Sequence, residues 1–556
     1  MSEPRSGGDR HGVGTLGVVK AIKDQLAALG AMPPWSGTCP LVEGSHGEPG
    51  FSPSPSAPDV ALGLRWITAR DGVRRGVGLV NVIKDHHQRQ GHKVARERNE
   101  RLSELLREAE WSRAQAAFGY NRVAAETLGT QVTENSKIGR SHVSMWVGGT
   151  QPSGVAPAIL CQALSRRLKR EITPQEAGFT AATSPGQGAL DWRADPLIAL
   201  NDLGSGVDTD RRRLLESGVY SAAALVLPDA SWWDVMSRPQ ASEAPGVRRV
   251  GPGDVETVRE LTLTFSRMDQ RRGGGHGRRA VDEYLRHEAL DLLRGRFADD
   301  ETRRAMFSAT AELSYVSGWM AFDNGDHALA LHRFNTAVKL AARSGDAPLS
   351  GHILRAMAHQ ALDLGFRAEA LKIAQASVDG KRYAGATPRE RALLGVVHAR
   401  ALAANDHGQQ AAKALLQAED DLSNARDGIR EPDRTFFFGE ASLAHETACT
   451  LRDLGDHQRA IKEFRRSVRT RGAAFQRTHA VTLGYMGATQ IAQGGVEEAC
   501  ATWTSVLDAM ESGIYSGRAR QRVVEMRQLL SPYRKRGIRV VSVLDARATT
   551  YLSQVD

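Results

Sequence analysis

Apolar side chains recur at helical spacing over most of the chain, beginning near Asn99. Within 99–110, the leucines at 102, 105 and 106 and the alanine at 109 define one face of a first helix. Ser112 is a favourable cap for a second helix over 113–128, and the apolar positions of 156–168 predict another. With a short helix after Thr173, these elements predict a compact helical domain over 94–180.

A short helix is also predicted within Gly139 to Pro152, GRSHVSMWVGGTQP. Ser141 can cap its amino terminus, and Gly149 can end it in a left-handed conformation. Val143 and Trp146 lie three apart and define its buried face. The remaining face carries Arg140, Ser141, His142, Ser144 and Met145. Small polar side chains at a helix amino terminus are typical of the second helix of a helix-turn-helix, which reads base edges in the major groove. A plain amphipathic connector is the alternative.

From Val255 the chain is helical almost to its end, and an internal repeat dominates it. A small or glycine turn followed by an alanine-rich amphipathic helix recurs, and another helix precedes each turn. The repeats begin at Asn324 (NGDHALALHRF), Leu364 (LGFRAEALKIA), Asn405 (NDHGQQAAKALL), Leu454 (LGDHQRAIKEF) and Gly494 (GGVEEACATW). The period is about 40 residues and is stretched once to about 50. Stacked helix pairs of this kind predict a tetratricopeptide-like α-solenoid over 255–535, with 536–556 as an unassigned tail.

A solenoid presents a concave surface that can hold a peptide or a helix. Polar residues on the first helices of the pairs are candidates to line this partner-binding groove. They are Arg355, His359, Arg400, Glu440 and His445. For each one, an ordinary exposed polar residue is the alternative interpretation.

Three further segments carry weaker signals. Residues 1–93 are rich in Gly, Pro and Ser and are predicted to be a disordered or weakly structured extension. Residues 181–254 are predicted to be a linker with one helix around 211–227, docked through Trp232 and Trp233. The stretch RRGGGHGRR at 271–279 suits a mobile surface turn better than a phosphate cradle, because no GK[ST] follows.

Composition and motifs narrow the function classes. The chain has 556 residues, 41% hydrophobic residues and a net charge of +9, which favours an acidic partner such as DNA. Its four cysteines form neither a disulfide framework nor a zinc site, and no catalytic or cofactor-binding motif holds. No apolar run is long enough for a membrane helix. We therefore expect a cytoplasmic protein that is not an enzyme and has no cofactor or metal.

The segments NERLSELLREAEWSRAQAA, SHVSMWVGGTQPS and ALSRRLKREITPQEAGF resemble the helix-turn-helix module of a family of actinomycete regulators related to the lambda-repressor-like Xre class. YVSGWMAFDNGDHALALHRF extends the resemblance into the repeats. The resemblance implies an all-α fold and control of differentiation or secondary metabolism. It also implies base contacts from Arg140, Ser141, His142 and Ser144, and phosphate contacts from Ser112, Arg113, Lys137 and Thr150.

The expected protein is a transcriptional regulator that binds double-stranded DNA and senses a ligand, peptide or protein partner through its repeats. We expect a homodimer, because an operator with two half-sites needs two DNA-binding domains. The alternative is a protein-interaction scaffold that never binds DNA. Steep salt dependence of DNA binding separates the two.

Overall fold

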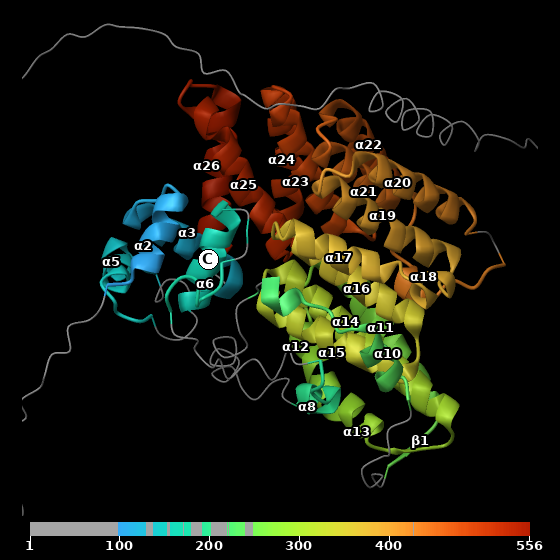
Figure 1. Cartoon of the computed structure of the whole chain (residues 1–556). Helices are drawn as coiled ribbons and strands as arrows, with labels where there is room; N and C mark the ends of the chain where they lie inside the picture. The colour runs from blue at the N-terminus through green and yellow to red at the C-terminus, as the bar shows by residue number, and fades with distance from the viewer. Residues whose placement is uncertain are drawn as a thin grey trace, which may run out of the picture. The chain divides into compact units, whose positions relative to one another are not determined.

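The computed structural model describes residues 98–128, 137–152, 156–168, 170, 172–179, 192–201, 220, 222–238, 248–425 and 428–555. These residues are mostly helical and include only two very short strands, which confirms the all-α class (Figure 1). The predicted extension over 1–93 lies outside the described residues. None of the described helices is both long and apolar enough to cross a membrane.

The amino-terminal module, residues 98–179, has its own apolar core. Its helices are α2 (Glu100–Glu108), α3 (Arg113–Leu128), α5 (Arg140–Val147) and α6 (Ala156–Leu168). Asn99 holds the two ends of the module together. Its Oδ1 accepts a hydrogen bond from the Leu102 amide at the start of α2, and its Nδ2 donates to the carbonyl of Ala177 at 2.9 Å. Residues 174–178 form turns rather than the short helix expected after Thr173.

The start of α5 differs from the prediction by two positions. Gly139, not Ser141, is the N-cap residue, and Ser141 lies exposed in the first helical turn. The backbone of Gly149 is left-handed with φ of 92°, as expected for the residue that ends the helix.

The segment expected as a linker contributes three short helical elements: α8 (Pro196–Asn201), the 3-10 turn η1 (Ala222–Leu225) and α10 (Ala230–Met236). Its apolar residues Leu200, Tyr220 and Leu225 are buried in the core of the repeat domain. Trp232 and Trp233 pack on the same core, so the docking prediction is confirmed. The predicted helix over 211–227 is replaced by the short turn η1 where it is described, and its residues 211–219 lie outside the described residues.

The repeat domain begins with β1 (Arg249–Val250), which pairs in parallel with β2 (Arg296–Phe297). Val250 lies opposite Phe297. Between the strands lie α11 (Pro252–Arg272), α12 (Arg278–Tyr284), the π-helical turn η2 (Leu285–Ala289) and α13 (Leu290–Leu293).

Six helix pairs follow. Their first helices are α14 (Asp300–Asn324), α16 (Ala347–Asp363), α19 (Pro388–Ala404), α21 (Glu440–Asp453), α23 (Gln476–Ala492) and α25 (Gly517–Arg534). The second helices are α15 (His327–Ser344), α17 (Arg367–Ser377), α20 (Gly408–Ser423), α22 (His457–Thr470), α24 (Val496–Glu511) and α26 (Arg539–Val555). The short elements α18 (Lys381–Ala384) and η3 (Asp433–Thr435) lie in connections. The tail left unassigned by the sequence thus ends in α26, which packs on α24 and α25.

The repeat signal corresponds to a recurring turn. Within the pairs that begin with α14, α16, α21, α23 and α25, a glycine with positive φ separates the two helices. In the α19–α20 pair Asp406 adopts the same conformation with φ of 63°. Left-handed backbone is least strained for glycine, which explains why the sequence repeats a small residue at this point.

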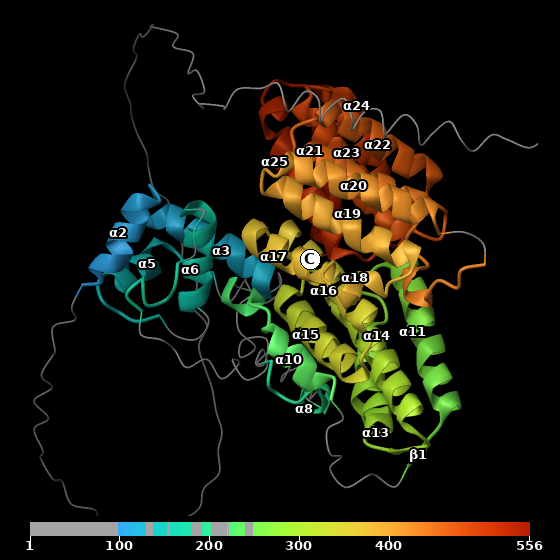
Figure 2. The ribbon, with the colours of Figure 1, turned by 45° about the vertical axis from the view of Figure 1, so that its right-hand side comes forward.

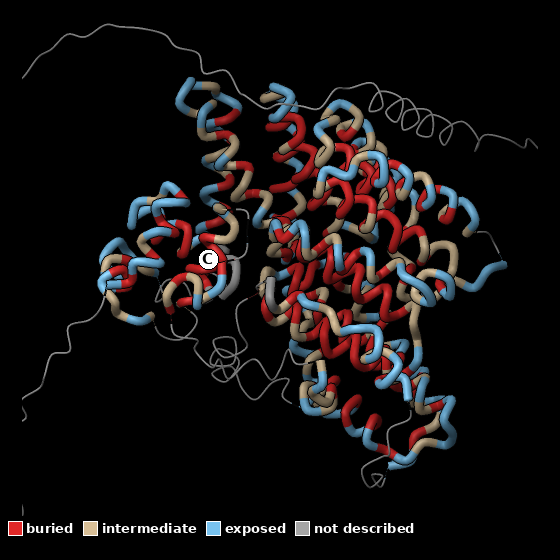
Figure 3. The backbone as a smooth tube through the Cα atoms, viewed as in Figure 1, coloured by how far each residue is buried: buried red, intermediate tan, exposed pale blue. Residues whose placement is uncertain are grey.

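The first helices form an inner layer, and Figure 2 shows them in succession from α14 and α16 through α19 to α21 and α23. Contact between α25 and α14 closes this layer. Each contacts the next along the array, from α14 through α16, α19, α21 and α23 to α25, and α25 contacts α14 again. Helix α11 also contacts both α14 and α23. Figure 3 shows the result, since most of the inner helices are coloured as buried. The array is therefore a closed ring of helices rather than an open solenoid.

Candidate functional site

The position of α5 in the amino-terminal module is fixed by one asparagine on α3. Asn121 Nδ2 donates to the carbonyl of Ile138 at 2.9 Å, and Asn121 Oδ1 accepts from the Ile138 amide at 2.9 Å. Both backbone groups of the residue before the N-cap are therefore bound by a single side chain. Below them, Val143 and Trp146 of α5 are buried, and the Trp146 ring lies 5.9 Å from that of Tyr120 on α3. The helix can neither rotate nor slide without breaking these contacts.

The opposite face of α5 is open to solvent. Arg140, Ser141 and His142 are exposed. His142 Nδ1 accepts a hydrogen bond from the Gly139 amide at 3.1 Å, so its Nε2 is the nitrogen that remains for an outside partner. Ser144 is half-buried, and its hydroxyl donates to the Arg140 carbonyl at 2.9 Å.

The residues predicted to contact phosphate differ in how exposed they are and in whether they are already bonded within the module. Arg113 is exposed, and its Nη1 donates to Ser144 Oγ at 3.2 Å, which links α3 to α5. Lys137 is exposed just before α5, and Thr150 is half-buried just after it. Ser112 instead caps α3, because its Oγ accepts from the Gln115 amide at 3.3 Å.

Lys137 and Arg140 give this surface positive charge. Residues 137–152 contain Lys137 and Arg140 but no aspartate or glutamate. Within the described part of the chain, no carboxylate lies within the 4.0 Å ion-pair distance of the Arg140 guanidinium. Elsewhere in the module, by contrast, Arg170 pairs with Glu108 at 2.8 Å. The α5 surface can therefore bind an anionic partner without first breaking an ion pair of Arg140.

The residues predicted to line the partner groove lie mostly inside the protein. Arg355, His359, Arg400 and His445 are 2–5% exposed, so neither an open groove nor an ordinary exposed position describes them. The physical reason is ring closure, because the first helices face one another across the inner layer. Glu440 alone is exposed, and its Oε1 accepts from Arg466 Nε of α22 at 3.0 Å.

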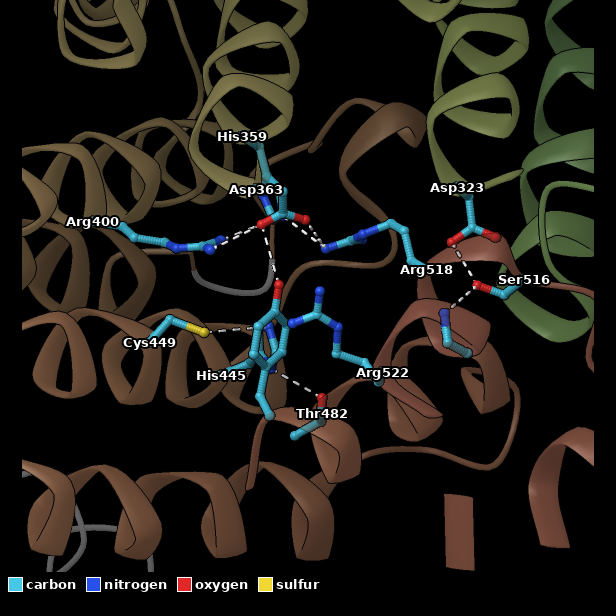
Figure 4. Close-up of polar contacts among 12 residues, drawn as sticks. Asp323, His359, Asp363, Arg400, His445, Cys449, Thr482, Ser516, Arg518 and Arg522 are labelled. Carbon is cyan, nitrogen blue, oxygen red and sulfur yellow. Dashed lines mark hydrogen bonds and ion pairs between the residues drawn. The ribbon is translucent and has the colours of Figure 1, made fainter. Parts of the chain in front are cut away.

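Asp363 at the end of α16 is the centre of the buried polar cluster (Figure 4). Its carboxylate accepts hydrogen bonds from Arg400 at 2.9 Å, Arg518 at 2.8 Å and the Tyr485 hydroxyl at 3.1 Å. Burial acts to raise the pKa of Asp363, but Arg518, His359 and Arg400 outweigh burial and hold it well below its ordinary value. This carboxylate therefore stays ionised and joins α16 to α19, α23 and α25.

A second part of the cluster surrounds His445. Its Nδ1 lies 3.0 Å from Thr482 Oγ1, and its Nε2 lies 3.7 Å from Cys449 Sγ. Burial lowers the pKa of His445 well below 6.5 and raises the pKa of Cys449 to about 12. The imidazole is therefore neutral and the thiol protonated, which is not the charge state of an activated cysteine nucleophile. In the described part of the chain, no three metal-ligating side chains are grouped to hold an ion.

The glycine loop after α11 closes the ring through Gly273 and Gly274, although most of the stretch 271–279 lies at the surface as expected. Gly273 and Gly274 are buried, and the Gly274 amide donates to Asp323 Oδ2 at 2.9 Å. Ser516 Oγ donates to Asp323 Oδ1 at 3.0 Å, as drawn in Figure 4. Arg477 lies 3.1 Å from Asp269 and 3.3 Å from Asp323. We call this set of residues the clasp, since it joins α11 and α14 to α23 and α25.

A cavity of about 350 Å³ lies between α11, α14 and the long connection from α20 to α21. Glu312 and Glu390 from the inner helices line it together with Arg434 from the connection. The helical pattern of the sequence does not single out these three residues or Asn121 and Asp363. The one sequence feature that points to any of these residues is the stretched repeat, because Arg434 lies within it.

Comparison with known proteins adds one finding. A family model described as the SP15 N-terminal domain matches residues 102–180, which correspond to the amino-terminal module. No curated protein and no solved structure matches the chain.

Proposed function

We propose that the chain is a DNA-binding transcriptional regulator whose repeat domain binds a peptide or protein partner. The observation that carries the proposal is the α5 surface, a rigidly held helix with exposed Arg140, Ser141 and His142 and no acidic residue between 137 and 152. A helix fixed in this way presents a constant set of donors to base edges, and its positive charge favours the phosphate backbone. The module is similar to a lambda-repressor-like helix-turn-helix in which α3 and α5 are the two helices.

The helix pairs of the repeat domain resemble tetratricopeptide repeats, a fold built for binding peptides and helices. A homodimer has two DNA-binding modules, one for each half-site of an operator. By resemblance to the actinomycete regulators, the controlled genes belong to differentiation or secondary metabolism.

The first test is genome-wide occupancy of the tagged protein beside a triple Arg140→Ala, Ser141→Ala, His142→Ala variant. Wild-type peaks that share a sequence motif and vanish in the variant support the regulator, and their motif gives a DNA duplex for binding in vitro. Absence of reproducible wild-type peaks across growth states contradicts it.

On that duplex, Arg140→Ala is expected to weaken binding by about 1–3 kcal/mol, because it removes a base or phosphate contact. Fluorescence anisotropy at several salt concentrations measures this loss. Arg107→Ala is the matched control, since it removes one exposed arginine from the last turn of α2 and leaves α5 unchanged. Equal losses for the two variants would mean that net charge, not the α5 surface, determines binding.

A specific observation favours the scaffold as second candidate. Phe118 on α3 is 71% exposed and Met145 on α5 is 48% exposed, and large apolar side chains on a surface suit a protein partner. In that case Phe118→Ser removes the interaction, whereas the triple α5 variant and added salt have little effect. Pull-down at low and high salt separates the two functions.

A further inference from the structure

The connection between α20 and α21 is the point at which the repeat period is stretched, and its described residues 428–439 turn into the ring. Insertions in repeat arrays commonly lie on one face, which is often the binding face. This segment is mostly not helical, with only the short turn η3 at 433–435, yet Thr435 is fully buried and Phe438 is 2% exposed. We call residues 430–438 the inserted segment.

Arg434 anchors the inserted segment in an acidic pocket. Its Nε and Nη2 donate to the two carboxylate oxygens of Glu390 at 2.7 and 3.0 Å, and its Nη1 donates to Glu312 Oε1 at 3.0 Å. Asp346 Oδ2 lies 3.8 Å from the same Nη1. The carboxylates come from α19, α14 and the N-cap of α16, so three parts of the inner layer converge on one guanidinium.

The electrostatics show a pocket that is built for a cation. Burial raises the pKa of Glu312. Burial also acts to raise the pKa of Glu390, but Arg434 and His352 outweigh burial and hold it at about 2. Two buried carboxylates close together are unfavourable without a partner, and a bidentate arginine is the side chain that compensates them best.

On the carboxyl-terminal side of Arg434, aromatic residues of the inserted segment also contact the inner layer. Phe437 lies over Arg355, with 6.0 Å between the guanidinium carbon and the ring centre. Arg355 is 2% exposed and has no carboxylate within ion-pair distance in the described part of the chain. Its Nη2 donates to the Tyr315 hydroxyl at 2.9 Å instead. The inner layer thus offers adjoining contacts for an arginine and for an aromatic ring.

We propose that the inserted segment occupies a binding site for a partner protein. The partner binds there through its own arginine, which is followed by aromatic residues. The partner displaces residues 430–438 and places its own arginine between Glu312, Asp346 and Glu390. The cavity beside Arg434 is where the incoming segment enters, because it adjoins the same carboxylates and is not filled by protein. This inference deepens the partner-binding part of the proposed function and rests on it, whereas DNA binding by α5 is independent of it.

The test uses a fluorescent peptide with the sequence of residues 428–439 and a second peptide in which its arginine at 434 is replaced by glutamine. The receptor is the full chain in which residues 430–437 are replaced by a Gly/Ser segment of equal length. We expect the arginine peptide to bind this receptor at least tenfold more tightly than the glutamine peptide does. It should also bind the receptor at least tenfold more tightly than it binds the wild-type chain. Equal binding of the two peptides, or no binding to a folded receptor, overturns the proposal.

Glu390→Gln in the receptor is expected to reduce binding of the arginine peptide at least tenfold. Glu301→Gln is the matched control, since it neutralises an exposed carboxylate of α14 outside the pocket and should leave the affinity unchanged. Equal effects of the two substitutions contradict a specific guanidinium site.

A second measurement uses the wild-type chain and does not depend on folding of the replaced one. Hydrogen exchange of the isotope-labelled wild-type chain reports whether the inserted segment leaves its place, where the Arg434 side chain is 10% exposed. Excess unlabelled arginine peptide should accelerate exchange of the amides of residues 430–438 severalfold without changing exchange in α5, and the glutamine peptide should not. Unchanged exchange of residues 430–438 at saturating peptide overturns displacement. Anisotropy with the operator duplex on the same preparation shows separately whether DNA binding is intact.

Discussion

At the scale of single residues, the inner layer is held by charged and polar side chains rather than by apolar contacts alone. Glu390 shows how closely these side chains depend on one another. Its Oε1 lies 2.7 Å from Arg434 Nε and 3.3 Å from His352 Nδ1, and His352 Nε2 lies 3.2 Å from Arg355. A change in one member therefore alters the charge balance of the others.

His352 gives this cluster a defined response to pH. Burial lowers its pKa to about 4, so between pH 4 and 6.5 the unfolded chain binds a proton that the folded chain does not. Stability from this residue is full above pH 6.5 and is lost as the pH falls toward 4. His352→Gln should therefore make the acid-side decline shallower, by up to about 1.4 kcal/mol per pH unit.

Urea unfolding at pH 5, 6 and 7 measures this decline. His407→Gln is the control, since His407 is exposed. If wild type and His352→Gln lose stability in parallel between pH 6.5 and 5, the neutral buried state assigned to His352 is wrong.

The sequence placed several of these residues correctly but not their surroundings. Helical periodicity put Arg355, His359, Arg400 and His445 on the first helices of the pairs, where the structure has them. Periodicity describes one helix at a time, whereas burial of these side chains follows from contacts between helices far apart in the chain. Asp363 and Arg518, for example, are 155 positions apart. A single sequence carries no direct signal of such a pairing.

At the scale of elements, α5 depends on a contact made outside the helix. Asn121→Ala removes both hydrogen bonds to the Ile138 backbone, each worth about 0.5–1.5 kcal/mol. We expect a folded module with weaker DNA binding, because the start of α5 is no longer fixed on α3. Asn121→Asp should lie between this variant and wild type, since it retains only an acceptor for the Ile138 amide. Anisotropy and thermal unfolding together measure this order, and wild-type affinity of Asn121→Ala would contradict it.

The boundaries of α5 and its buried face could be read from the sequence to within two residues, because Val143, Trp146 and Gly149 have local meanings. Asn121 could not be found in this way. An asparagine within a helix is ordinarily a surface residue, and its role here depends on a connection whose path no local pattern determines.

Gly274 of the clasp and its neighbour Gly275 differ in how well they tolerate a side chain. A Cβ on Gly274 would lie 2.2 Å from the Met320 carbonyl oxygen, whereas one on Gly275 would approach no atom closer than 3.2 Å. Gly274→Ala should therefore destabilise the repeat domain by about 1–3 kcal/mol, and Gly275→Ala should have little effect. Thermal unfolding compares the two variants, and faster hydrogen exchange near Ser516 in Gly274→Ala would locate the loss at the clasp. Equal melting temperatures would mean that the loop does not hold the ring closed.

At the scale of the whole molecule, the sequence predicted the all-α class and the repeated helix pairs from turn residues and periodicity. It did not predict ring closure. The glycine loop at 273–275 looks like a flexible turn because glycine commonly marks one. Here its missing side chains allow close approach to the backbone of Met320 and Tyr515. The absence of a Cβ atom allows both a flexible turn and a close approach of two backbones, so composition alone cannot distinguish these two roles of glycine.

Ring closure also imposes an order on biosynthesis. An open array can fold repeat by repeat as it leaves the ribosome, because each unit contacts only its neighbours. In this chain the partner of Asp269 is Arg477, which lies 208 positions later. At the usual rate of translation, about 10–40 s pass between the synthesis of these two residues. Until then the acidic groups of α11 and α14 face water or a chaperone. The repeat domain can therefore be completed only after α23 and α25 have been synthesised, and its nascent chain is exposed for longer than its modular sequence implies.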